Sequence, residues 1–148
     1  MLLNIPLKKH IWKVAGIGMG VVFSILIIHI MQFINHALYP VESEDLIKGS
    51  SAYVQFINSN PIFLVGILFS NATASFTGGA IARLTHSKVS VVAAGWVGAV
   101  LLILDLSNLI MVDYPLWFWL FSIIIYIPSA WLGAFAITHF QSNIITDP

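Results

Sequence analysis

The sequence predicts an all-α membrane protein built as a four-helix bundle, and two observations support this prediction. The chain has 148 residues, of which 59% are hydrophobic and only 8% are charged, whereas a soluble domain usually carries about 25% charged residues. Four segments are also long and apolar enough to cross a bilayer, which takes roughly 20 residues in a helix. Because these segments are apolar on all sides, we expect lipid around them.

The four spans follow one another with short breaks, in a single transmembrane domain over 1–148. We expect them at about 14–38, 61–82, 89–112 and 116–137. Tyr39-Pro40 ends the first span, and Pro61 opens the second at a position where a missing N–H costs nothing. Residues 85–88 form a short turn, and 113–115 separate the last two spans. The first apolar run is longer than the roughly 7–15 residues of a signal peptide, so we expect it to be retained.

The segment 41–60 has room for further structure between the first two spans. It combines the acidic residues Glu42, Glu44 and Asp45 with apolar side chains such as Tyr53 and Ile57. This composition predicts a helix lying at the membrane interface.

The basic residues predict the orientation of the chain. Five of the six Lys and Arg residues flank the same ends of the spans: Lys8, Lys9, Lys13, Arg83 and Lys88. Lys48 alone lies in an opposite loop, beside acidic residues. Because Lys and Arg concentrate on the cytoplasmic side of membrane proteins, we expect both termini in the cytoplasm.

The two halves of the chain resemble each other. Each half contains a Tyr-Pro turn, at Tyr39-Pro40 and Tyr114-Pro115. Each also contains a Gly-Ala-x-Ala segment, beginning at Gly79 and at Gly133. Two tandem helical hairpins related by a parallel pseudo-two-fold axis would explain this, an arrangement known in transporters. Chance is the alternative, since small residues and Tyr-Pro turns are common in membrane hairpins.

Polar residues lie at a similar depth in the predicted spans and form the candidate binding site. Counted at about 1.5 Å per residue, each span contributes at least one polar side chain to this layer. The candidate ligand- or ion-binding residues are His29, Gln32, His36, Asn71, Asp105 and Asn108, and Ser122 is the matching residue on the last span.

Asp105 is the most informative of these residues, because an ionisable group inside a membrane is costly and usually faces protein or a water-filled cavity. We expect His29 to be its partner, with Asn71 or Asn108 supplying hydrogen bonds. The functional interpretation is a proton- or cation-binding site, or the polar wall of a small ligand pocket. The structural interpretation is a hydrogen-bonded knot that fixes helix pairing.

The residues give less support to a cofactor, a metal site, catalysis or nucleic-acid binding. The chain has no cysteine, which excludes disulfides, thiolate nucleophiles and Cys-ligated metals. We expect no cofactor, because His10, His86 and His139 lie at the opposite end from His29 and cannot pair with it on a haem. A metal bound by His and Asp in the polar layer stays undecided. We predict no catalytic residues, and the net charge of zero excludes a basic surface for nucleic acid.

Several stretches together are similar to a family of small, uncharacterised bacterial integral membrane proteins with four spans. These stretches are Tyr39-Pro40, 71–83, 113–118 and 126–133. In that family a polar or His residue precedes a Gly-rich segment, and this chain has Asn71 where many relatives have His. The resemblance implies a location in the bacterial inner membrane and gives no activity.

Three functions are therefore compatible with the sequence. The leading prediction is a non-enzymatic structural or accessory protein of the lipid bilayer, which associates with itself or with another membrane protein. The alternatives are a small transporter or channel component that uses the polar layer, and a membrane enzyme or redox subunit acting on a lipid-soluble substrate. Transport predicts a water-accessible cavity at the layer, an enzyme predicts a lateral opening, and a structural role predicts a closed, dry knot.

Overall fold

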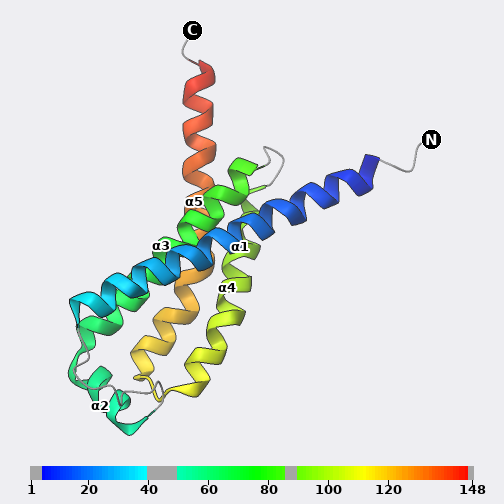
Figure 1. Cartoon of the computed structure of the whole chain (residues 1–148). Coiled ribbons are helices and arrows are strands. Elements are labelled where there is room, and N and C mark those ends of the chain that lie inside the picture. Colours follow the sequence, from blue (N-terminus) through cyan, green and yellow to red (C-terminus); the bar gives the residue numbers. More distant parts are fainter. Residues whose placement is uncertain (1–4, 40–49, 86–89, 147–148) are drawn as a thin grey trace.

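The computed structural model describes residues 5–39, 50–85 and 90–146, and these are helical with no strand among them. The helices are α1 (Ile5–Leu38), α2 (Ser51–Ser59), α3 (Pro61–Thr85), α4 (Val91–Met111) and α5 (Leu116–Thr146) (Figure 1). Four of them are long and apolar enough to cross a membrane, over Ile11–Leu38, Pro61–Thr85, Val91–Met111 and Leu116–Ser142. The predicted all-α four-helix bundle is confirmed.

The helices extend beyond the predicted spans at several ends. α1 begins at Ile5, and α5 continues through Pro128 to Thr146. A helix satisfies its own backbone hydrogen bonds, so it does not have to stop where the hydrocarbon does. The predicted bounds therefore locate the apolar part of each helix. The start of α1 and the end of α5 both project from the end of the bundle opposite α2, in different directions (Figure 1).

α3 is the central helix of the bundle. It packs against α1, α2, α4 and α5, whereas α1 and α5 do not pack against each other within the described residues. Half of the most apolar stretch of α3 is buried inside the protein, 50% against 17% for α1. The side chains that α3 presents to its neighbours therefore determine how the bundle closes.

α3 and α5 approach each other closely through two glycines. A Cβ atom added to Gly79 would fall on the carbonyl oxygen of Ala130, and one added to Gly133 would fall on the carbonyl oxygen of Phe76. Ala130 precedes Gly133 by as many residues as Phe76 precedes Gly79, so the two contacts are reciprocal. Such reciprocity is expected at a local two-fold axis. It favours the predicted repeat, in which α1 corresponds to α4 and α3 to α5. The repeat is not exact, because α4 packs against α3 while α1 does not pack against α5 among the described residues.

Serine hydroxyls join the helices at the same level as the small residues. Ser24 Oγ on α1 donates to the carbonyl oxygen of Ala74 on α3 at 2.8 Å. Ser75 Oγ on α3 donates to the carbonyl oxygen of Tyr126 on α5 at 2.5 Å. Small residues that let backbones approach, with hydroxyls bonded across the gap, are the usual means of helix association in lipid.

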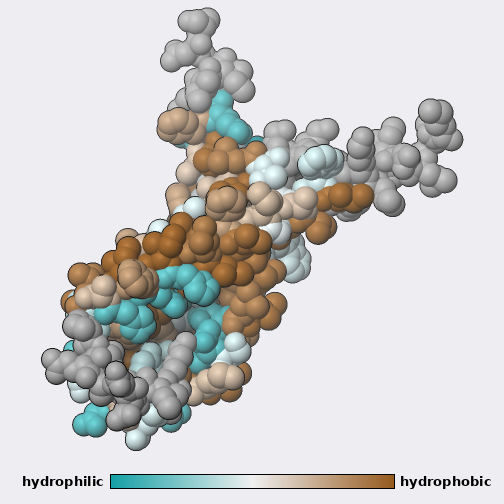
Figure 2. Space-filling model, viewed as in Figure 1, coloured by the Kyte–Doolittle hydropathy of each residue, from teal (hydrophilic) through white to brown (hydrophobic). Residues whose placement is uncertain are grey.

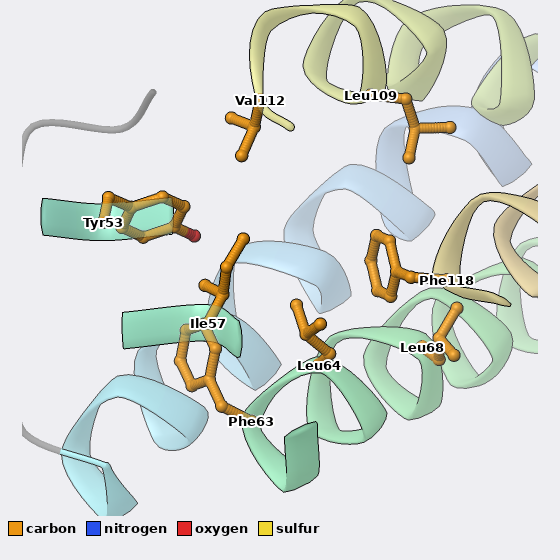
Figure 3. Close-up of a cluster of buried hydrophobic side chains, with 8 residues drawn as sticks. All are labelled: Tyr53, Ile57, Phe63, Leu64, Leu68, Leu109, Val112 and Phe118. Atoms are coloured by element: carbon orange, nitrogen blue, oxygen red, sulfur yellow. The ribbon is translucent and has the colours of Figure 1, made fainter. Parts of the chain in front are cut away.

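α2 covers one end of the bundle. It begins after Ser50, whose hydroxyl accepts a hydrogen bond from the backbone N–H of Tyr53 at 3.2 Å. Figure 3 shows Tyr53 and Ile57 of α2 directed toward side chains from α3, α4 and α5. The cluster comprises Tyr53, Ile57, Phe63, Leu64, Leu68, Leu109, Val112 and Phe118. The helix predicted in 41–60 therefore exists over Ser51–Ser59, and 41–49 lie outside the described residues.

Candidate functional site

Two neighbouring pockets lie inside the bundle and meet at the predicted polar layer. The larger one, here the membrane chamber, has a volume of about 370 Å³ and is lined by residues of α1, α3, α4 and α5. The smaller one, here the cap chamber, has a volume of about 280 Å³ and lies against Tyr53 of α2. Gln32, Asp105 and Asn108 line both chambers. Their volumes are close to the lower end of the range for ligand sites.

The structure brings all six candidate residues to the walls of these chambers. His29, Gln32, Asn71, Asp105 and Asn108 line the membrane chamber. The cap chamber shares three of them and adds His36. Figure 2 shows hydrophilic side chains around a hollow near the α2 end of an otherwise hydrophobic surface. Whether this layer binds a ligand stays a prediction.

The membrane chamber lies deep within the helices. Asn71 is ten residues from the start of α3 at Pro61, and Tyr126 is ten residues from the start of α5 at Leu116. At about 1.5 Å per residue, both side chains lie about 15 Å from those helix ends. This is close to half of the roughly 30 Å hydrocarbon core of a bilayer.

Asp105 has polar neighbours at this depth. Asn108 Nδ2, one turn along α4, donates to its Oδ1 over a long distance of 3.4 Å. The hydroxyl of Tyr126 on α5 lies near the same carboxylate. Tyr126 is buried, lines the membrane chamber, and was missed by the sequence analysis, which named His29 as the partner. The signal for it was a tyrosine in the middle of a span, where a hydroxyl needs a partner.

His29 lines the same chamber and bonds to its own helix. Its Nδ1 lies 2.7 Å from the carbonyl oxygen of Ile25. A carbonyl oxygen only accepts hydrogen bonds, so Nδ1 carries the proton. In the neutral ring Nε2 is then an acceptor. The imidazole of His29 is exposed, at the side of the bundle between α1 and α4.

Asn71 presents an unpartnered donor at the chamber wall. Its side chain is only 2% exposed, and its Nδ2 has no hydrogen-bond partner. A buried donor left unbonded costs roughly 1–3 kcal/mol. Such a group in a residue that lines a chamber calls for an explanation. Ser122 Oγ is also buried without a partner, but Ser122 does not line either chamber.

Asn35 is a second residue that the sequence analysis did not select. It is 6% exposed and lines the cap chamber. Its Nδ2 donates to the carbonyl oxygen of Phe63 at 3.2 Å, and its side-chain oxygen lies against Gly66. The signal was its position three residues after Gln32, on the same face of the helix. Asn35 fixes α1 to the start of α3 and so holds one wall of the cap chamber.

Two tyrosines close the cap chamber beneath α2. The phenol groups of Tyr53 on α2 and Tyr114, between α4 and α5, lie near each other. Burial raises the pKa of both phenols above the ordinary 10.0. The pKa of Tyr114 is raised further by the neighbouring Tyr53 and by the charge of Asp105. Both phenols therefore stay protonated at neutral pH, and their packing in the same cluster joins α2 to the turn.

The membrane chamber opens sideways between α1 and α4. Ile25 on α1 and Leu104 on α4 line it and are 37% and 50% exposed. Ile28 and Leu101 complete an aliphatic wall. Because these exposed residues belong to helices long and apolar enough to span a membrane, this side of the chamber would meet lipid in a bilayer.

The remaining histidines lie away from the chambers or outside the described residues. His139 stacks on Phe135 of α5, with ring centroids 6.5 Å apart. His86 is not among the described residues, and neither is the side chain of His10. Within the part of the chain that the structure describes, no three His, Cys, Asp or Glu side chains are grouped to hold a metal ion.

Comparisons with known proteins add no relative to this picture. No family model, curated protein or solved structure matches the chain. The resemblance to small bacterial four-span proteins therefore stays a prediction, and the function has to be argued from the chambers themselves.

Proposed function

We propose that the protein is a small transporter or channel component that binds a solute inside the membrane, in the chambers around Asp105. The observation that supports this most is that Asn71, whose Nδ2 has no hydrogen-bond partner, is one of the residues that line an open chamber of about 370 Å³. A structural knot would use its polar groups on one another and leave no such space. The geometry therefore favours the transport alternative over the structural role that the sequence analysis ranked first.

The charge of the chambers favours a cationic solute or a proton. Asp105 is the only Asp, Glu, Lys or Arg among the described residues that line them. An ionised carboxylate at membrane depth is stabilised by a cation or by taking up a proton. Tyr126, Asn108 and Gln32 then hold the carboxylate and complete the shell of the solute.

The proposal extends to the setting of the protein. We place it in a bacterial inner membrane with both termini in the cytoplasm, on the distribution of Lys and Arg described above. Four spans are few for transport by a single copy, so we propose that two copies act together. The exposed apolar faces of α1, α4 and α5 offer ample surface for such an association.

Flux in proteoliposomes tests the proposal. The purified protein is reconstituted with a pH-sensitive dye or a cation-sensitive dye inside the vesicles. We expect flux above that of empty vesicles, and at least about a tenfold loss in Asp105→Asn. Asp113→Asn is the matched control, because Asp113 is exposed and lines neither chamber. Equal flux in both variants and in wild type, or flux no higher than in empty vesicles, would contradict the proposal.

A further inference from the structure

The walls of the membrane chamber carry two facing stripes with the same spacing. On α1 the stripe consists of Ile25, Ile28, His29 and Gln32. On α4 it consists of Leu101, Leu104, Asp105 and Asn108. Both follow the i, i+3, i+4, i+7 pattern of one helix face. Each residue of the α1 stripe precedes its counterpart in the α4 stripe by the same number of residues. The predicted repeat of the two hairpins requires this.

Each stripe changes from apolar to polar along its length. The first two residues are aliphatic and the last two are polar, on α1 as on α4. Since α1 and α4 both run toward the α2 end, the polar halves lie together at that end (Figure 1). The aliphatic halves lie deeper in the bundle. The chamber is therefore graded from hydrocarbon-like to polar, in the way that an amphiphile is.

The opening of the chamber determines how such a molecule enters. Ile25 and Leu104 are exposed on the two sides of the gap between α1 and α4. An alkyl chain can pass between them into the lipid with no loss of apolar contact. A fully hydrated solute would gain nothing from these aliphatic walls.

The polar half of the chamber selects the head group. The Asp105 carboxylate supplies the negative charge, and His29 Nε2 supplies a further acceptor in the neutral ring. Asn71 lines the same chamber. A head group that carries a protonated amine would donate to both acceptors. A phosphate or sulfate head group would instead be repelled by the negative charge of Asp105.

On these grounds, and resting on the proposed function, we propose that the solute is a single-chain amphiphilic amine that enters from the lipid. Its ammonium head lies at Asp105, and its alkyl chain leaves between α1 and α4.

Photo-crosslinking in lipid nanodiscs tests this with a decylamine analogue that carries a diazirine in its chain. We expect labelled peptides from 25–32 and 101–108, suppressed by excess decylamine and not by decyl sulfate or decanol. Labelling should fall at least about tenfold in Asp105→Asn and remain in Asp113→Asn. Labelling spread over the apolar surface, or equal suppression by the anionic or neutral compound, would overturn the proposal.

A second pair of variants tests the lateral route. Leu104→Trp fills the opening, whereas Ile103→Trp adds the same ring at a neighbouring residue that does not line the chamber. We expect loss of crosslinking in Leu104→Trp alone. If short butylamine competes as well as decylamine, or Leu104→Trp is without effect, the lipid route is wrong while Asp105-dependent flux still supports the proposed function. If Asp105-dependent flux is absent as well, both proposals fail.

Discussion

At the scale of single residues, the candidate site depends on polar groups that are costly to bury in a membrane. Asp105 accepts a hydrogen bond from Asn108 and lies near the Tyr126 hydroxyl, whereas Asn71 keeps an unbonded donor. The residue types and their depth were predictable from spacing along each span. The partners were not, because sequence spacing says nothing about which face of α5 meets α4. Tyr126, which spacing along the spans did not single out, lies near Asp105 for that reason.

Replacing Asn71 separates stability from function. Asn71→Leu keeps the branched shape and the number of side-chain heavy atoms and removes the unbonded amide, so we expect the free energy of unfolding to rise by about 1–3 kcal/mol. Flux and amine binding should be lost. Ser122→Ala removes the other orphan group away from the chambers and should stabilise without loss of flux. Thermal unfolding in detergent, measured beside flux, checks this. A destabilised Asn71→Leu would show that the amide has a partner.

At the scale of helices, α3 and α5 form the tightest contact of the bundle. The sequence predicted small residues at helix contacts, but it offered many such pairs without ranking them. Gly79 and Gly133 are decisive because each faces a backbone carbonyl of the other helix. Gly18 fits the same composition and has open space around it. Which glycine is essential depends on how each helix is rotated about its own axis, because this decides which face meets a neighbouring helix. The spans are too uniformly apolar for the sequence to specify that rotation.

Leucine substitutions at these glycines should differ sharply. Gly79→Leu and Gly133→Leu place side-chain atoms on the facing backbone, and overpacking of this kind costs typically 1–3 kcal/mol. Gly18→Leu should leave stability unchanged, because nothing lies within 4 Å of its Cβ position. Thermal unfolding of the three variants provides the comparison. Equal effects at Gly18 and Gly79 would mean that α3 and α5 are packed differently.

The docking of α2 should depend on pH through two phenols. The pKa values of Tyr53 and Tyr114 are raised in the folded protein, so the fold favours their protonated forms. Their stabilisation is complete below the unfolded pKa of 10.0 and is lost as pH rises past it. Tyrosinate absorbance and thermal unfolding measured against pH should show this loss of stability. In the double variant Tyr53→Phe/Tyr114→Phe the loss of stability at high pH should be smaller. If wild type and double variant lose the same stability at high pH, these two phenols are not its cause.

At the scale of the whole molecule, the four spans, their order and their all-helical nature followed from hydropathy alone. The chambers did not, because a cavity depends on how far α1 stands from α4. The sequence also left open whether the polar residues close upon one another. The structure separates them around shared space, with Gln32, Asp105 and Asn108 between the two chambers.

The predicted orientation can be measured with single cysteines, because the chain contains none of its own. Ser90→Cys and Ser142→Cys lie near the ends of α4 and α5 that are opposite α2, and Ser59→Cys lies on α2. All three positions are exposed. In intact bacterial cells an impermeant thiol reagent should label Ser59→Cys alone. Labelling of Ser90→Cys and Ser142→Cys instead would reverse the orientation.

The openness of the membrane chamber is the claim on which the proposed function depends, and the reactivity of a cysteine at position 71 measures it most directly. Asn71→Cys should react with a small thiol reagent in reconstituted bilayers, although the native side chain is only 2% exposed. Ala74→Cys, one turn along α3 and equally buried, lines no chamber and should stay unreactive. If the two cysteines are equally inert in the folded protein, the polar layer is a closed knot and the account is wrong.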